Sequence, residues 1–258
     1  MKPVQEFTRS RWFAGGGSEI LPAQAAVEAE VQLSVNGDVW LGFHCTPDDL
    51  EALAIGFLYN QGFIQSAAEV ETLQICESRD HIDVWLAHSV EKPTHWSRTS
   101  GCLGGVVLAE TVREKPASPS VLVMGEDLFA RVDAFLVSLA EQDHLRQGQH
   151  TSMLLDRQAV SLLSSDIGRH NTLDKIAGAS LMKGIDFNDP TLITTGRISA
   201  DMVDKAARMA VPLVISLHSA SDMAIAAAEQ LQITLVGHAR RSQIDIYTHP
   251  EQISFGGM

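Results

Sequence analysis

One thiol in a glycine-rich stretch is the first feature of the sequence that could carry chemistry. Cys102 lies within residues 100–105, which read Ser-Gly-Cys-Leu-Gly-Gly and lack the apolar periodicity that would bury a side chain. The glycines leave the backbone free to move and let other groups approach the sulfur. Such a thiol suits a sulfur carrier, because persulfide transfer depends on the thiolate fraction and on access. The alternative interpretation is a free cysteine in a turn with no chemical role.

The other two cysteines, Cys45 and Cys76, lie in or beside predicted strands and are interpreted as buried spectators. Three cysteines at wide spacing form neither a disulfide framework nor a Cys-x-x-Cys zinc knuckle. The signature of the zinc deaminases is missing as well. We therefore expect reduced thiols and no metal site.

A second candidate site is the polar run at residues 165–175, where a predicted strand passes through a glycine turn into a helix. Asp166, Arg169, His170 and Asn171 gather at this turn. Free backbone N–H groups and the dipole at the start of a helix favour an anion there. The alternative is an ordinary helix cap, in which Asp166 or Asn171 satisfies backbone N–H groups and Arg169 is solvated.

Two further turns at predicted strand ends carry basic residues. In the first, Ser199 is the predicted N-cap of a helix and Arg197 is suited to bidentate contact with phosphate. In the second, Arg240 and Arg241 follow a predicted strand. Loops at the carboxyl ends of strands in an open α/β sheet are the usual place for ligands. The alternative for the two adjacent arginines is a pair of solvated surface charges.

The chain divides into three segments that must position these residues. Residues 1–27 are expected to be a flexible N-terminus, and residues 28–119 a smaller α+β part that contains the Cys102 stretch. In residues 120–258, predicted strands alternate with predicted helices, and apolar runs such as 212–217 indicate strands covered on both faces. The pattern predicts an α/β protein whose main domain has three layers, α/β/α.

Two local signals shape the smaller part. Alternating apolar residues before Asn36-Gly37 and an apolar run after it, at residues 39–41, predict a hairpin with a type I′ turn. Thr46-Pro47, followed by acidic residues, predicts the start of a helix with Thr46 as its cap. Both elements precede the Cys102 stretch in the chain.

Charge and hydropathy exclude several classes of partner. The formal net charge is −13, from 32 acidic against 19 basic residues, so no long nucleic acid is expected as a partner. A small anion site remains compatible with this charge, since charges act over a Debye length of about 8 Å. No apolar run reaches the roughly 18–20 residues that cross a bilayer, and residues 1–17 contain no apolar core of a secretory signal. We expect a cytoplasmic protein without membrane contact.

Several long motifs occur in the order typical of the FdhD family. The most specific is residues 166–175, Asp-Ile-Gly-Arg-His-Asn-Thr-Leu-Asp-Lys. The others are residues 30–37, 46–50, 54–58, 62–64, 195–199, 233–237 and 246–250. Over about residues 28–253 the chain therefore resembles the FdhD family, the sulfurtransferase-like accessory proteins of formate dehydrogenase.

The resemblance implies a homodimer whose main domain is similar to the cytidine deaminase fold without its zinc site. It implies a carrier that accepts persulfide sulfur from a cysteine desulfurase. The carrier then transfers this sulfur to the bound molybdenum bis(molybdopterin guanine dinucleotide) cofactor, before that cofactor enters formate dehydrogenase. The persulfide position maps onto Cys102. The cofactor-binding positions map onto His238, Ala239, Arg240, Arg241, Ser242 and Gln243, with Arg169, His170 and Arg197 nearby.

The chain departs from the family pattern at positions that bear on sulfur transfer. The second loop cysteine of the family, three places after the first, is Gly105 here, so a resolving thiol is lost. Ser165 replaces the acid that usually precedes the motif at residues 166–175. These departures leave an alternative open: a divergent member that binds the cofactor or a guanine nucleotide, or chaperones a formate dehydrogenase, without moving sulfur.

Overall fold

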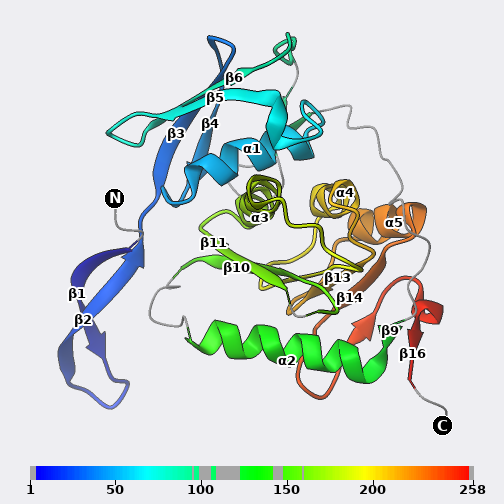
Figure 1. The fold of residues 1–258 in the computed structure, drawn as a ribbon. Helices are drawn as coiled ribbons and strands as arrows, with labels where there is room; N and C mark the ends of the chain where they lie inside the picture. The colour runs from blue at the N-terminus through cyan, green and yellow to red at the C-terminus, as the bar shows by residue number, and fades with distance from the viewer. Residues whose placement is uncertain are drawn as a thin grey trace.

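Two sheets separated by helices make up most of the molecule (Figure 1). The fold is that of a computed structural model, which describes residues 4–94, 96–98, 106–108, 123–141, 148–158 and 160–255. The predicted carrier residue, Cys102, lies outside the described residues.

The main domain is built on a six-stranded sheet with the order β11-β10-β12-β13-β14-β15. Its strands are β10 (His150–Leu155), β11 (Ser161–Asp166), β12 (Thr191–Thr194), β13 (Leu213–Ser216), β14 (Thr234–Gly237) and β15 (Asp245–Ile246). β12, β13 and β14 run parallel, whereas β10 is antiparallel to both of its neighbours, β11 and β12. The start of β10 therefore lies at the same edge of the sheet as the carboxyl ends of β11 to β14. We call this the carboxyl edge.

Helices cover both faces of this sheet (Figure 1). One face carries α2 (Gly125–Glu141), and the other carries α3 (Arg169–Lys183), α4 (Ala200–Arg208) and α5 (Asp222–Leu231). The apolar strands serve both faces because successive side chains alternate: Val214 belongs to the cluster under α3, α4 and α5, and Ile215 to the cluster under α2. The prediction of an α/β protein with three layers in its main domain is confirmed.

The smaller part is a four-stranded sheet, β4-β3-β6-β5, with one helix packed on it. The elements are β3 (Ala29–Val35), β4 (Asp38–Cys45), α1 (Leu50–Asn60), β5 (Val70–Ile75) and β6 (His81–Leu86). Asn36 and Gly37 connect β3 to β4 with φ angles of 50° and 87°, as a type I′ turn requires. The predicted hairpin is confirmed.

The predicted helix cap at Thr46 is wrong. The helix begins four residues later at Leu50, and its N-cap position is Asp49, with a φ of 46°. Thr46 is fully buried and turns its polar groups toward the main domain: its N–H donates to the Asp166 carboxylate at 3.1 Å. The N–H and the hydroxyl of Thr46 are thus hydrogen-bonded to residues about 120 positions away, and not to the first turn of the helix.

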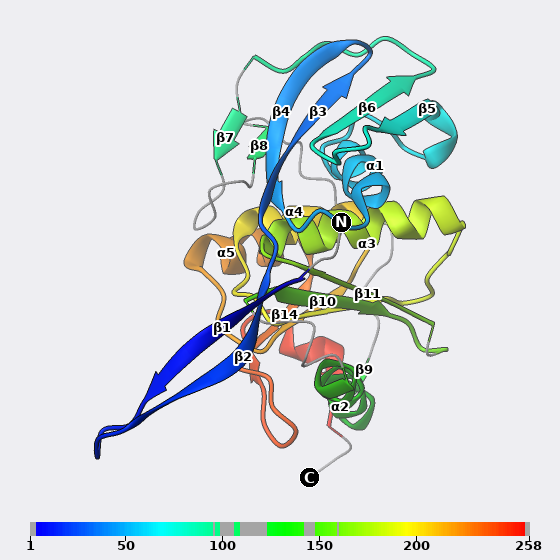
Figure 2. The same ribbon diagram turned by 90° about the vertical axis from the view of Figure 1, so that its left-hand side faces the viewer.

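The N-terminal segment, expected to be flexible, forms a hairpin of β1 (Val4–Trp12) and β2 (Ser18–Ala26). The strands pair along their full length, with Val4 opposite Ala26 and Trp12 opposite Ser18. Gly16 and Gly17 supply positive φ angles of 90° and 94° in the turn. The hairpin extends away from the rest of the molecule (Figure 2), so it buries no continuous apolar face and leaves no periodic signal in the sequence.

Short elements complete the described chain. They are η1 (Ala67–Glu69), β7 (Trp96–Arg98), β8 (Val106–Leu108), β9 (Val123–Met124), η3 (Pro250–Gln252) and β16 (Ile253–Ser254). β7 pairs antiparallel with β8, and β9 pairs parallel with β16. Among the helices that the structure describes, none has both the length and the apolar character needed to cross a membrane.

The two parts of the molecule meet where α1 crosses α3 in direct backbone contact. A Cβ atom on Gly56 of α1 would lie 1.7 Å from the carbonyl oxygen of Asp174, and one on Gly178 of α3 would lie 1.9 Å from that of Ala52. Neither distance can be tolerated, so each helix needs a glycine where the other approaches it. The crossing fixes the smaller sheet on the face of the main domain that carries α3, α4 and α5.

Replacement of either glycine should separate the helices. Gly56→Ala and Gly178→Ala are each expected to lower the free energy of unfolding by about 3 kcal/mol, at the upper end of the usual cost of overpacking a core. Urea denaturation followed by circular dichroism measures this loss. Gly15→Ala is the control, because a Cβ atom there meets nothing within 4 Å. A Gly56→Ala protein as stable as the wild type would contradict the close crossing.

Candidate functional site

A buried lysine joins the smaller part to the carboxyl edge of the main sheet. The Lys175 side chain is only 1% exposed, and its Nζ lies 2.8 Å from Asp166 Oδ2 and 2.5 Å from Asp48 Oδ1. The same ammonium group donates to the carbonyl oxygen of Thr46 at 3.1 Å. Burial lowers the pKa of Lys175, but the carboxylates of Asp166 and Asp48 raise it more, so its pKa lies above the usual value. The lysine is therefore charged and fully paired.

The Asp166 carboxylate is satisfied on all sides. Besides Lys175 and the Thr46 N–H, it accepts hydrogen bonds from the Gly168 N–H at 2.8 Å and from Asn171 Nδ2 at 2.9 Å. Asn171 also donates to the carbonyl oxygen of His44 at 2.9 Å. Asp166 and Asn171 both belong to the most specific sequence motif. Through Thr46 and His44 they hold the β11–α3 turn against the end of β4.

A second buried ion pair involves the residue directly before Lys175 on α3. Lys205 Nζ of α4 is 2.5 Å from Asp174 Oδ2, and both side chains are at most 3% exposed. Asn60 at the end of α1 donates to the other oxygen of Asp174 at 2.8 Å. Three helices are thus connected through a single carboxylate.

A group of four basic side chains occupies the carboxyl edge, and we call it the basic cluster: His150, Arg169, Arg197 and His218. His150 starts β10, Arg169 starts α3, and the other two lie in the turns after β12 and β13. Burial first, and then the positive charges of Arg169, His218 and Arg197, lower the pKa of His150. Arg169 and His150 both border the turn after β12, where a Cβ atom on Gly196 would lie 3.1 Å from Cβ of Arg169 and 3.6 Å from Nδ1 of His150.

His170, a predicted cofactor contact, points into the protein rather than toward solvent. It is 2% exposed, and its Nε2 lies 3.1 Å from Ser199 Oγ. Burial, together with the positive charges of Lys205, Arg169 and His150, holds the pKa of His170 well below its usual value. His170 is thus a neutral ring that links the starts of α3 and α4, and Ser199 uses its hydroxyl for this contact.

The two arginines of the predicted cofactor loop are directed apart. Arg240 Nη1 donates to the carbonyl oxygens of Leu217 and Ala239 at 2.6 and 2.7 Å, which orders the loop. Arg241 Nε instead lies 2.6 Å from Asp133 Oδ1 on α2, and both of these side chains are more than half exposed. Exposed ion pairs of this kind contribute little, about 0–1 kcal/mol, so Arg241 is available to a competing anion.

The other residues of this loop lie beside the turn after β13. The N–H of His238 donates to the carbonyl oxygen of His218 at 2.7 Å, and the N–H of Ala239 to that of Ser216 at 3.0 Å. The Arg240 N–H closes the loop onto the carbonyl oxygen of Gln243 at 2.8 Å. Ser242 is exposed.

The two described cysteines have surroundings unsuited to a carrier. Cys45 is fully buried, and burial followed by the charge of Asp166 raises its pKa to about 12. Cys76 is half-buried and its thiol donates to Asp80 Oδ1 at 3.0 Å. In the sequence, Cys102 falls between β7 and β8, which pair antiparallel.

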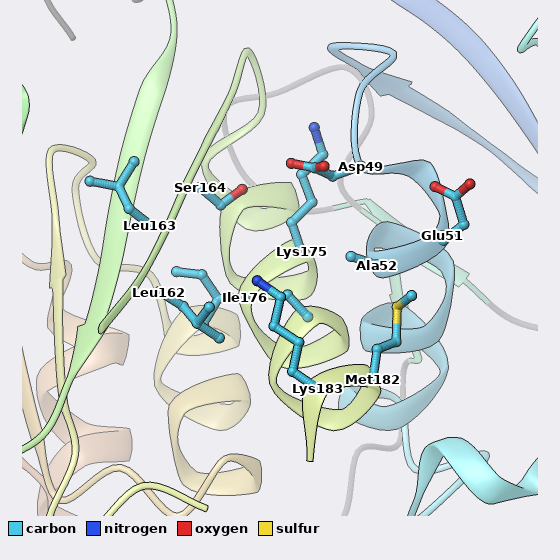
Figure 3. Close-up of a pocket in the computed structure, with 11 residues that line it drawn as sticks. Asp49, Glu51, Ala52, Leu162, Leu163, Ser164, Lys175, Ile176, Met182 and Lys183 are labelled. Carbon is cyan, nitrogen blue, oxygen red and sulfur yellow. The ribbon is translucent and has the colours of Figure 1, made fainter. Parts of the chain in front are cut away.

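A cleft of about 340 Å³ opens between α1, α3 and β11 (Figure 3). Acidic Asp49 and Glu51 line one end, and Met182 and Lys183 line the other. None of the predicted site residues lines it, so we do not place the site there. Among the described residues, no group of three or more His, Cys, Asp or Glu side chains is arranged to hold a metal ion.

Comparison with known proteins identifies the family. The model of the FdhD/NarQ family matches residues 26–254. The chain belongs to this family. The FdhD/NarQ match spans both parts of the molecule, the basic cluster and the Cys102 stretch. It confirms the resemblance seen in the sequence motifs.

Individual FdhD relatives agree with this assignment. The chain is 31% identical over 257 residues to the sulfur carrier protein FdhD of Shouchella clausii, covering 95% of this chain and 96% of the relative. It is 34% identical over 251 residues to the sulfur carrier protein FdhD of Bacillus subtilis, covering 91% and 93%. A crystal structure of a formate dehydrogenase accessory protein from Desulfotalea psychrophila superposes with a TM-score of 0.81 at 26% identity, covering 98% of this chain and all of the other. The similarity to the cytidine deaminase fold stays a prediction.

Sequence reasoning missed two members of the basic cluster and the role of Lys175. His150 and His218 are isolated histidines in the sequence. His150 reaches the carboxyl edge because β10 is antiparallel to β12, and His218 reaches it because it follows the parallel strand β13. Lys175 was visible as the last residue of the most specific motif, but two of its three partners, Thr46 and Asp48, are more than 120 residues away. Its place in the motif, beside Asp174, was the only signal that the sequence offered.

Removal of the Lys175 charge should leave Asp166 buried without its counter-ion. Lys175→Met is expected to lower the free energy of unfolding by about 3–5 kcal/mol, the usual cost of breaking a buried ion pair. Lys183→Met, at an exposed position of the same helix, is the matched control and should change stability by less than about 0.5 kcal/mol. Thermal and urea denaturation measure both. Equal stability of the two variants would be incompatible with the buried network.

Proposed function

We propose that this protein is a sulfur carrier that accepts persulfide sulfur from a cysteine desulfurase. It passes this sulfur to a molybdenum cofactor destined for formate dehydrogenase. The observation that carries the proposal is the family match over residues 26–254, together with relatives that are named sulfur carriers. Cys102 is the proposed carrier, since neither Cys45 nor Cys76 is an exposed, unengaged thiol.

The loading step is thiol exchange. The Cys102 thiolate attacks the outer sulfur of the desulfurase persulfide, a new S–S bond forms, and the desulfurase cysteine leaves as a thiolate. Release of the outer sulfur as sulfide then needs two electrons, which thiols supply. One thiol attacks Cys102 to form a mixed disulfide, and a second reduces that disulfide.

The substrate that receives the sulfur is proposed to lie at the carboxyl edge. Its nucleotide carries phosphate groups, and the described residues that offer positive charge there are Arg169, Arg197 and the loop from His238 to Gln243. His170 supports this site from behind, because it holds α3 and α4 together and stays neutral. The dinucleotide nature of the substrate, a homodimeric assembly and a cytoplasmic location are parts of the same proposal.

A second candidate function is a family member that binds the cofactor or a guanine nucleotide, or chaperones a formate dehydrogenase, without sulfur transfer. Gly105, in place of a second loop cysteine, favours it. A carrier with one thiol can hold a persulfide, but it cannot resolve that persulfide by an internal disulfide. A test of whether the protein accepts sulfur from a cysteine desulfurase distinguishes the two functions.

Incubation with a cysteine desulfurase and cysteine should add one sulfur atom to the peptide that contains Cys102. Mass spectrometry of the intact protein and its peptides detects this adduct. It should vanish in Cys102→Ala and persist in Cys76→Ala, the control that removes a half-buried thiol. No adduct under conditions that load another sulfur carrier would leave only the binding function.

Loss of both loop arginines should weaken nucleotide binding. Arg240→Ala together with Arg241→Ala removes the contacts that order the loop and a cation held only by an exposed ion pair. The Kd for GDP, measured by calorimetry, is expected to rise about tenfold. The control variant, Arg157→Ala with Lys183→Ala, removes two exposed cations elsewhere. An unchanged Kd in the loop variant would place the nucleotide away from this loop.

A further inference from the structure

The cleft between α1, α3 and β11 contains no residue of the basic cluster, and charged groups of opposite sign line its two ends (Figure 3). Asp49 and Glu51 lie at one end, and Lys183 lies at the other. We propose that this cleft binds a small ω-amino acid, a molecule whose ammonium and carboxylate groups are separated by an unbranched apolar chain. Such a site is additional to the proposed function and does not depend on it.

The acidic end of the cleft can accept a cation from a ligand. Lys175, whose side chain also lines the cleft, is already paired with the carboxylates of Asp48 and Asp166. Asp49 and Glu51 add two exposed carboxylates at the rim. Within the part of the chain that the structure describes, neither of these two takes part in an ion pair. An ammonium group of a ligand would therefore find carboxylates that no lysine of the protein neutralises.

The wall that β11 contributes presents a buried hydroxyl group. Ser164 is only 7% exposed and lines the cleft, with its oxygen directed into it (Figure 3). None of the described residues forms a hydrogen bond with Ser164 Oγ. Buried polar groups are nearly always hydrogen-bonded, because an unpaired one costs free energy. The unpaired hydroxyl therefore indicates a ligand with a polar group at this position, and an ammonium group can donate to a hydroxyl as well as to carboxylates.

An apolar surface and then a cation follow along α3. Leu162, Ile176 and Ala179 line the cleft, and such a surface suits a chain of methylene groups. Lys183 comes eight positions after Lys175 on α3, which is a rise of about 12 Å. Its ammonium group extends back along the helix toward the middle of the cleft (Figure 3). A carboxylate at that end would pair with Lys183, whereas a second ammonium group would be repelled, so the cleft favours an amino acid over a diamine.

The dimensions of the cleft suit a small ligand. Its volume of about 340 Å³ lies at the lower end of the range for small-molecule sites. A chain of five methylene groups, as in 6-aminohexanoate, together with a polar contact of about 2.8 Å at each end, spans a length similar to the spacing along α3. A lysine at the carboxyl terminus of a partner chain offers the same two charges at the same spacing. The volume matches the free molecule, so we assign the site to it rather than to a chain end.

Titration of the isotope-labelled protein with 6-aminohexanoate, followed by two-dimensional NMR, tests the site. The amide signals of Ser164 and of the first turn of α1 should shift. Asp49→Asn with Glu51→Gln keeps the shape of both side chains and should raise the Kd about tenfold, because charge-assisted hydrogen bonds are lost. Ser164→Ala should raise the Kd about threefold without lowering stability in urea, because its hydroxyl has no partner among the described residues. A hydroxyl with a merely structural role would lower stability when it is removed.

The variant Lys183→Met tests the other end of the ligand. It should raise the Kd for 6-aminohexanoate about fivefold, because the partner of the ligand carboxylate is lost. It should leave the Kd for hexylamine unchanged, because hexylamine has no carboxylate. An equal loss of affinity for both compounds would show that Lys183 does not face the carboxylate, and would contradict the proposed orientation.

The control is Asp38→Asn with Glu71→Gln, which changes the same two residue types at exposed positions elsewhere. It should bind 6-aminohexanoate like the wild type. The proposal is overturned by a wild type whose spectrum does not change at millimolar ligand, by an unchanged Kd in the variant of Asp49 and Glu51, or by an equal loss in that variant and the control. A peptide with a free carboxyl-terminal lysine that binds more tightly than 6-aminohexanoate, and whose amidated form does not bind, would overturn the assignment to a free ligand in favour of a chain end.

Discussion

The buried ammonium group of Lys175 is the interaction on which the arrangement of the chain depends. It brings the β4–α1 connection, through Thr46 and Asp48, onto the end of β11 at Asp166. Removing charges from water is costly, and only complete pairing offsets that cost. Because these partners come from the β4–α1 connection and from β11, the start of α3 is fixed at the carboxyl edge, and with it the position of Arg169.

The buried cations of this protein and the exposed ones have different roles. Lys175 and Lys205 are buried and paired with carboxylates, so they fasten helices and strands together. Arg197 lies at the surface of the same domain, where a ligand can reach its positive charge. The most specific family motif, residues 166–175, spans both classes. Most of its polar residues build the junction between the two parts, and Arg169 alone is shared with the basic cluster.

The sequence predicted elements well wherever burial imposed a pattern. The apolar strand at Leu213–Ser216 and the Asn36-Gly37 turn follow local rules, and the structure has both. The N-terminal hairpin escaped prediction because it has no continuous buried face, and its strands are stabilised by pairing with one another. Thr46 was mistaken for a helix cap because its true partners lie about 120 residues further along the chain.

The same limit applies to the candidate site. Arg240 and Arg241 were expected to act together, but one guanidinium is held by backbone carbonyls and the other by a carboxylate on α2. Such choices depend on tertiary neighbours that adjacent sequence positions do not reveal. His150 and His218 illustrate the converse, since side chains without any local signal become neighbours when an antiparallel strand returns its first residue to the carboxyl edge.

The crossing of α1 and α3 has a consequence for how this sequence can change. The atoms that exclude a side chain at Gly56 and Gly178 belong to the backbone, the carbonyl oxygens of Asp174 and Ala52. A clash between two side chains can be removed by replacing one of them with a smaller residue. A clash with a peptide group cannot be removed in this way, because every residue has the same backbone atoms. A substitution at either glycine therefore has to be accommodated by a movement of one helix relative to the other. Each glycine faces a different peptide group, so the two positions restrict the distance between the helices independently of each other.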